Sequence, residues 1–157
     1  KLLYEDGTIQ HAGMVTGVRN LIGTAFHCLP SDTSHHFNMA QCARDVTLLC
    51  GALIMMRRAV FHAIGGWNED SFAIAHSDTD LCLKVWSAGM RCVYTPYAQL
   101  LHIGHVSIGL DEKKEQNNKK PKAKGEIALL RRWPAAIPRP RRRPPPRPHH
   151  RAQRHRR

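Results

Sequence analysis

The distribution of charged and apolar residues along the chain limits its fold more than any other feature of the sequence. The 157 residues include 24 Lys and Arg against 12 Asp and Glu, and 17 of the basic residues but only 4 of the acidic ones follow residue 110. The same C-terminal stretch holds 8 of the 10 prolines and few apolar side chains. Such a composition cannot bury enough apolar surface to offset the entropy that is lost on ordering. We therefore expect one folded domain over residues 1–110 and a disordered Lys/Arg/Pro-rich tail over residues 111–157.

The cysteines and the longest apolar run indicate the cellular setting. All five cysteines lie in the first 110 residues, without a Cys-x-x-Cys pair, and several stand inside apolar runs. We expect reduced, mostly buried thiols of a cytoplasmic protein, with peripheral attachment to the inner face of the membrane as the alternative. The longest apolar run, residues 46–56, is much shorter than the ~20 residues of a transmembrane helix, so no transmembrane segment is predicted.

Segments with the patterns of strands and of helices alternate along residues 1–102, which favours an α/β fold. Gly65-Gly66 and Gly89 each end a predicted helix, and Ser77 with Asp80 three residues later approximates a capping box. The expected elements are, in chain order, strand-like pieces at 2–4, 9–13 and 14–18, a buried strand at 46–56 interrupted by Gly51, a helix at 58–64, a helix at 77–88 and a strand at 91–95.

The residues between 51 and 102 also form a recognisable pattern. It consists of Gly51, Arg57, Arg58, Phe61, Gly65-Gly66-Trp67, Asp78, Asp80, Leu81, Leu83, Gly89, Pro96 and His102. In order and nearly in spacing, this set resembles the acceptor half of the family 2 glycosyltransferases, and the similarity extends over most of residues 1–102. The resemblance implies a partial GT-A domain, the nucleotide-diphospho-sugar transferase fold. The nucleotide-binding half that precedes this stretch in the family is absent and the chain begins in strand-like residues, so we expect a fragment.

The resemblance implies an activity and gives the two acids separate roles. It implies inverting transfer of a sugar from a nucleotide-sugar donor to a glycan or lipid-linked acceptor, in the assembly of cell-envelope polysaccharide. An inverting transfer needs a carboxylate that takes the proton of the acceptor hydroxyl, and Asp78 matches the position of that base. Asp80 matches the family's second acid, with a structural or acceptor-orienting role. Spacing alone leaves the alternative that both acids only stabilise the N-terminus of their helix.

Four other residues are candidates for binding substrate. Gly51 and Ala52 would form part of the acceptor site. Trp67 could stack on the apolar face of a sugar ring, although a single Trp after two glycines is more often a core residue. Lys84 stands where the family usually has Arg, and it keeps the positive charge without the planar guanidinium.

His102 is the candidate metal ligand. It matches a histidine that helps to bind the divalent metal or the donor diphosphate in related GT-A enzymes, and a neutral imidazole is a good ligand. The alternative is a plain polar histidine at the end of a strand, because the second His and the Glu of the family pattern are replaced here. The family implies Mg²⁺ or Mn²⁺ on an Asp-x-Asp motif, and none precedes the acceptor half. We therefore expect the chain alone to bind metal and donor nucleotide weakly or not at all and to lack detectable transfer activity.

The C-terminal tail has two interpretations. As a polybasic, proline-rich segment it would bind nucleic acid or anionic lipid through salt-sensitive phosphate contacts, which would make the chain a nonenzymatic binding protein. Runs of Arg, Pro, Ala and His are also what a GC-rich gene yields when it is read out of frame. We favour the second interpretation because the family resemblance ends before the tail begins.

Overall fold

The computed structural model of the protein describes residues 1–18, 21–72, 75–103 and 124–137. The strands of this part of the chain are short: β1 (Leu2–Leu3), β2 (Ile9–His11), β3 (Met14–Thr16), β4 (Ile22–Thr24), β5 (Arg44–Val46), β6 (Cys92–Tyr94) and β7 (Leu100–Leu101). The helices are α1 (His35–Asn38), α2 (Arg58–Ala63), α3 (Glu69–Phe72) and α4 (Ser77–Ser87), with 3-10 turns η2 (Met39–Gln41) and η3 (Gly51–Leu53). A further helix covers residues 124–132. The fold is therefore mixed α/β, as the sequence predicts.

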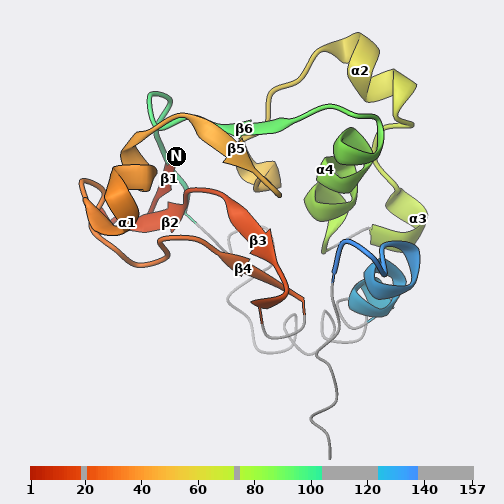
Figure 1. The fold of residues 1–157 in the computed structure, drawn as a ribbon, viewed down its shortest axis with the longest axis horizontal. Helices are drawn as coiled ribbons and strands as arrows, with labels where there is room; N and C mark the ends of the chain where they lie inside the picture. Colours follow the sequence, from red (N-terminus) through yellow and green to blue (C-terminus); the bar gives the residue numbers. More distant parts are fainter. Residues whose placement is uncertain (19–20, 73–74, 104–123, 138–157) are drawn as a thin grey trace, which may run out of the picture.

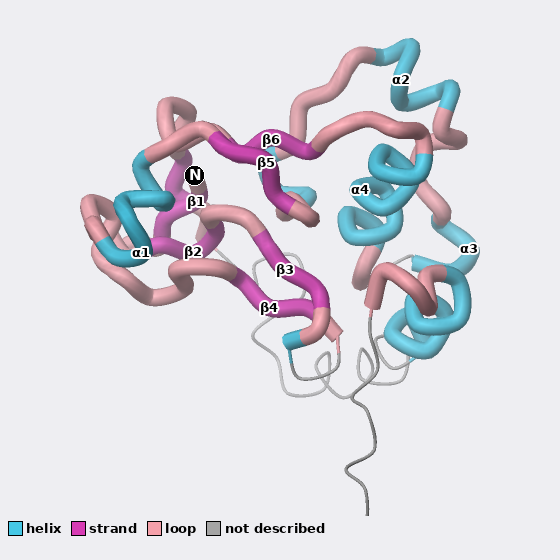
Figure 2. The backbone as a smooth tube through the Cα atoms, in the orientation of Figure 1, coloured by secondary structure: helices cyan, strands magenta, loops and turns pink. Residues whose placement is uncertain are grey.

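The strands form three small sheets. In the first, β1 pairs antiparallel with β2 and parallel with β7, so the sheet order is β2-β1-β7. β3 pairs antiparallel with β4, and β5 pairs antiparallel with β6. Figures 1 and 2 show these strands on the left and centre of the view and helices α2, α3 and α4 on the right, with residues 124–137 in blue beside α3. The first sheet thus joins the two ends of residues 1–103, because β1 pairs with β7. Helices α2, α3 and α4 lie on the other side of the molecule.

The core lies where β2, β3, β5 and β6 face helix α4. Its buried members include Ile9, Met14, Val46, Leu48, Phe72, Leu83, Val85, Tyr94, Leu129 and Ile137. Leu129 and Ile137 come from the helix at residues 124–132 and the turn that follows it, and both have no exposed surface. The C-terminal described segment is therefore part of the same core as the sheets.

This packing contradicts the expected disorder for part of the tail. The apolar spacing of Leu129 and Trp133, one helical turn apart, gives the segment a face that it can bury. The prediction of a disordered tail from residue 111 is consequently wrong for residues 124–137. The other residues of the tail, 111–123 and 138–157, lie outside the described residues, and with them lies most of the predicted polyanion-binding run at residues 131–150.

The expected buried strand at residues 46–56 is also wrong. β5 ends at Val46, and beyond it only Leu48 continues the pairing, through an isolated bridge to Met14. From Gly51 the chain makes the turn η3, and Met55 is 97% exposed. The apolar residues that follow Gly51 border surface hollows instead of filling a sheet. An apolar run in the sequence does not by itself distinguish a buried strand from such a surface segment.

The predicted helices are confirmed, but one cap is not. α2 ends before Gly65 and Gly66, which have φ of 80° and 55°, values that favour glycine. α4 begins at Ser77 as expected, yet its N-cap is His76 in the left-handed region (φ 68°) and no side chain caps it. The capping box is therefore wrong, because the chain enters α4 through His76.

The predicted strand at residues 91–95 is confirmed as β6, and all five cysteines are free as expected. They are not mostly buried, however, since Cys28 and Cys42 are exposed and only Cys82 and Cys92 are fully buried. Within the described ranges, no helix combines the length and the apolar character that a membrane span needs.

Candidate functional site

Asp78, the second residue of α4, has both carboxylate oxygens held by backbone amides. Its Oδ2 accepts a hydrogen bond from the Gly51 N–H at 2.9 Å, and its Oδ1 accepts one from the Thr79 N–H at 2.7 Å. A Cβ at Gly51 would lie 3.2 Å from the Cβ of Asp78, so glycine permits this close approach. The side chain is half-buried. The Thr79 hydroxyl also donates to Oδ1, at 3.4 Å. The arrangement fixes the direction of the carboxylate and leaves a lone pair on Oδ2 for another donor.

The groups on either side of Asp78 are uncharged near neutral pH. Burial lowers the pKa of the His76 imidazole, with the charges of Glu126 and Asp78 opposing that shift. Burial raises the pKa of the Cys50 thiol.

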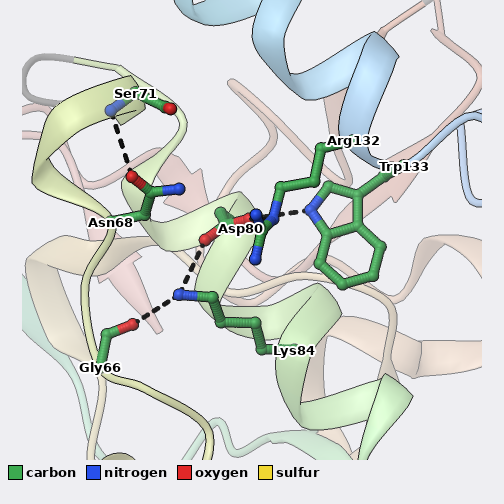
Figure 3. Close-up of polar contacts among 7 residues, drawn as sticks. All are labelled: Gly66, Asn68, Ser71, Asp80, Lys84, Arg132 and Trp133. Atoms are coloured by element: carbon green, nitrogen blue, oxygen red, sulfur yellow. Dashed lines mark hydrogen bonds and ion pairs between the residues drawn. The ribbon is translucent and has the colours of Figure 1, made fainter.

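Asp80, two residues further along α4, has no exposed surface. Its Oδ1 accepts hydrogen bonds from the Trp133 indole N–H at 2.8 Å and lies 2.9 Å from the Arg132 Nε (Figure 3). Its Oδ2 lies 3.1 Å from the Lys84 Nζ. The Lys84 ammonium also donates to the Gly66 carbonyl at 2.8 Å. Asp80 thus ties together α4, the Gly65-Gly66 turn and the C-terminal described segment.

Trp67 separates two surface hollows. It is 41% exposed and packs edge to face on Phe61, with 6.0 Å between the ring centroids. A hollow of about 380 Å³ on one side is lined mainly by apolar residues: Gly51, Ile54, Met55, Met56, Arg58, Phe61, Trp67 and Leu81. The hollow on the other side is polar and includes Glu69, Asp70, Lys84 and Arg132. Trp67 is therefore a surface residue whose ring reaches the same hollow as Gly51, the glycine that holds Asp78.

His102 is not close to this group in the fold. It follows β7, its Nδ1 lies 2.6 Å from the Gln10 Oε1, and its backbone N–H donates to the Leu3 carbonyl at 3.0 Å. It lines a separate hollow with Tyr4, Glu5, Asp6, Thr8, Cys28 and Ile103. Across the described residues, no three His, Cys, Asp or Glu side chains come together in a group that could hold a metal ion. The residues present thus do not fit the metal site that the family pattern implies, and the contacts of His102 match its alternative role at the end of a strand.

The structure brings together most of the residues that the sequence singles out. Gly51, Trp67, Asp78, Asp80 and Lys84 are linked by the contacts above, and Ala52 is exposed beside Gly51 in η3. Three residues of the same network were not predicted: His11, whose Nε2 accepts from the Cys50 N–H next to Gly51, Arg132 and Trp133. An apolar helix-like pattern around Leu129, ending in Arg-Arg-Trp, could have signalled the last two within an otherwise basic tail.

Comparisons with known proteins identify the family. The model of "Glycosyl transferase family group 2" matches residues 4–133, which includes the helix at residues 124–132. The chain belongs to this glycosyltransferase family. No solved structure matches it.

Three relatives show what share of a longer protein the chain corresponds to. It is 36% identical over 134 residues to the uncharacterized protein y4gI of Sinorhizobium fredii, which covers 85% of the chain and 14% of the relative. It is 36% identical over 103 residues to the O-antigen biosynthesis protein RfbC of Myxococcus xanthus, covering 65% of the chain and 8% of the relative. It is 37% identical over 68 residues to an N-acetylglucosaminyl-diphospho-decaprenol L-rhamnosyltransferase of Mycobacterium tuberculosis, covering 43% and 22%. The chain therefore spans less than a quarter of the length of each of these glycosyltransferase-family relatives.

Proposed function

We propose that the chain is the acceptor-side part of a GT-A domain that transfers a sugar from a nucleotide-sugar to a glycan or lipid-linked acceptor, with inversion and with Asp78 as the base. One observation carries the proposal. The Asp78 carboxylate is half-buried and is aimed by the amide of Gly51, which lines the same hollow as Trp67. Asp80, in contrast, is enclosed by cations and has no exposed surface. Only Asp78 of this pair is placed to meet a hydroxyl group from outside.

The proposed step uses the carboxylate of Asp78 to raise the nucleophilicity of the acceptor. As the acceptor oxygen forms its bond to the anomeric carbon of the donor sugar, its proton passes to a carboxylate oxygen of Asp78. The bond between the anomeric carbon and the nucleoside diphosphate breaks, and the diphosphate leaves with the bonding electrons from the opposite face. The configuration at that carbon inverts. The Gly51 and Thr79 amides hold the carboxylate in direction throughout.

Other residues of the site receive acceptor-binding roles in this proposal. Trp67 stacks on a sugar ring, and Gly51 and Ala52 let the ring approach the backbone of η3. Asp80 and Lys84 act indirectly: the Lys84 Nζ is held by Asp80 and by the Gly66 carbonyl, so the pair fixes the turn that carries Trp67. The names of the Myxococcus and Mycobacterium relatives support a cell-envelope polysaccharide or a lipid-linked saccharide as the acceptor class.

We further propose that the donor-binding half of the enzyme is supplied by residues outside this chain. The share of each relative that the chain covers supports this division of labour. The 157-residue protein should then show no turnover of UDP-, GDP- or dTDP-sugars with Mg²⁺ or Mn²⁺. Turnover that Asp78→Asn abolishes would place the donor site within the chain and would overturn the division.

Acceptor binding tests the site on the chain itself. The probe is a short-chain N-acetylglucosaminyl-diphospho-prenol, titrated into the ¹⁵N-labelled protein. We expect the amide signals of Gly51, Ala52 and Trp67 to shift, and Trp67→Ala to weaken binding about tenfold. The exposed Trp86, whose indole N–H donates to the Thr47 carbonyl, provides the control variant Trp86→Ala. Shifts confined to the His102 hollow would contradict the proposed acceptor site.

A further inference from the structure

The segment that leads to Gly51 has no regular strand pairing, although its backbone is firmly held. The Leu48 N–H donates to the Met14 carbonyl of β3 at 3.3 Å, and the Met14 N–H returns a bond to the Leu48 carbonyl at 3.0 Å. The Leu49 N–H donates to the Cys82 Sγ of α4 at 3.3 Å. Neighbouring amides are thus bound by different elements, so the path of the segment depends on individual side chains and bridges.

The next two amides lead directly to the candidate base. The Cys50 N–H donates to the Nε2 of His11 at 3.3 Å, and the Gly51 N–H donates to the Asp78 Oδ2 at 2.9 Å. His11 therefore holds the Leu49–Cys50 peptide through the Cys50 N–H, and the next peptide, Cys50–Gly51, holds Asp78 through the Gly51 N–H. The Cys50 carbonyl accepts from the Leu53 N–H of η3 at 3.2 Å, but the Cys50 N–H itself is held by the His11 ring.

The geometry defines the protonation state of His11. Its Nε2 also lies 3.3 Å from the Gly13 N–H, so two backbone donors converge on one ring nitrogen. That nitrogen must be unprotonated to accept, and the proton of the neutral ring must then be on Nδ1. The side chain is 7% exposed, so water cannot readily replace it as the acceptor for these two amides.

We propose that His11 is a positioning residue for the transfer step: its unprotonated Nε2 holds the Cys50 N–H, and thereby the backbone that presents the next amide, the Gly51 N–H, to the Asp78 carboxylate. The inference rests on the proposed role of Asp78 as the base. His11 touches no substrate in this account and acts only through the peptide. A residue at this position without an acceptor would leave the amide of Cys50 unsatisfied and would let Gly51 and Asp78 move apart.

The surroundings of His11 keep its ring neutral. Burial lowers its pKa to about 4, and the positive charges of the N-terminal ammonium and of Arg44 act in the same direction. The Cys50 thiol beside it stays protonated because burial raises its pKa. The described groups that act on the ring therefore all favour the state in which Nε2 accepts.

Two substitutions separate the acceptor role from simple packing. Gln at position 11 can offer its Oε1 near the place of Nε2, whereas Leu has a comparable bulk and no acceptor. In the 157-residue protein we expect His11→Leu to speed hydrogen exchange of the Cys50 amide at least about tenfold and to broaden or shift the Gly51 and Asp78 signals. His11→Gln should retain protection close to that of the native chain. Equal protection in both variants, or loss in both, would overturn the inference.

The native chain gives a test that does not depend on the folding of a variant. A long-range ¹H–¹⁵N spectrum at pH 7 should show the His11 Nε2 as the unprotonated nitrogen, and a proton on Nε2 would rule out the contact to Cys50. Failure of the proposed function has a different signature. If Asp78→Asn leaves sugar transfer unchanged in the polypeptide that also carries the donor-binding half, while the His11 results are as expected, His11 holds the Cys50 amide but Asp78 is not the base.

Discussion

Asp78 and Asp80 lie two residues apart on the same helix, but their surroundings differ in almost every physical respect. Asp78 is half-buried, accepts from two backbone amides and the Thr79 hydroxyl, and is hydrogen-bonded to Gly51, which lines an apolar surface hollow. Asp80 is fully buried and faces the Lys84 ammonium from α4 itself and a guanidinium and an indole N–H from residues 132 and 133. Alternating positions at a helix N-terminus thus separate a carboxylate that can exchange a proton from one that organises the fold.

The largest expected effect is on the Asp80 side. Asp80→Asn removes the negative charge between Lys84 and Arg132, and a buried pair that loses one partner costs about 3 kcal/mol. Urea unfolding should show this loss in the free energy of unfolding. Asp70→Asn, at an exposed acid of α3, is the matched control and should change it by less than about 0.5 kcal/mol. Equal effects of the two substitutions would mean that the cluster around Asp80 does not stabilise the fold.

Acidification should act on the Asp78 side through His11. The pKa of His11 is about 4 in the folded protein and about 6.5 when unfolded, so the unfolded state takes up the proton first as the pH falls. Stability is lost below about pH 6.5, by roughly 2 kcal/mol between pH 7 and pH 5. The measurement is urea unfolding at both pH values. His11→Gln, which cannot titrate, should lose less over the same interval, and an identical pH dependence would remove His11 as its cause.

The C-terminal described segment should contribute a smaller effect. Trp133→Phe keeps the aromatic packing and removes the indole N–H that donates to Asp80, which we expect to cost about 1.5 kcal/mol because the acceptor is charged. Trp86→Phe removes an N–H that donates to the Thr47 carbonyl at a more exposed position and should cost less. Thermal or urea unfolding measures both. A larger effect at Trp86 would contradict the importance of the Trp133 contact.

The smallest expected effect is on the Asp78 side and tests the close approach of Gly51. In Gly51→Ala the new Cβ meets the Asp78 Cβ at 3.2 Å, so the carboxylate must shift by a few tenths of an ångström. We expect sugar transfer by the polypeptide that carries this segment to fall about fivefold, equivalent to about 1 kcal/mol, with the free energy of unfolding unchanged. A variant as active as the native protein would show that the close approach of Gly51 does not aim Asp78.

The sequence alone predicts helix α4 correctly, but it does not predict the residues that surround this helix. The pattern of Asp78, Asp80 and the Gly65-Gly66 turn is local, so it was found from residues alone and the helices it predicts are present. Two partners of Asp80, Arg132 and Trp133, lie about 50 positions away in the sequence. The overall composition of residues 111–157 is basic and hides the apolar pattern of their segment. The left-handed His76 before α4 likewise follows from tertiary packing, since histidine carries no local signal for that conformation.

The run at residues 46–56 shows the same limit. Its apolar letters fit a buried strand, but the hydrogen bonds of Leu48, Leu49 and Cys50 go to three different elements. The sequence does not predict the role of His11 for a related reason, because its function as an acceptor depends on Cys50, a residue 39 positions away. Long-range polar contacts of this kind leave no periodic trace in the sequence.

The most direct test of the account compares sugar transfer by Asp78→Asn and by the native protein, in the polypeptide that carries this segment together with its donor-binding half. Asparagine keeps the size of the side chain and can still accept from the Gly51 amide, but it cannot take a proton. The account predicts a fall in transfer rate of at least about 100-fold with the free energy of unfolding nearly unchanged. A variant that retains transfer within about threefold of the native rate would contradict the assignment of Asp78 as the base.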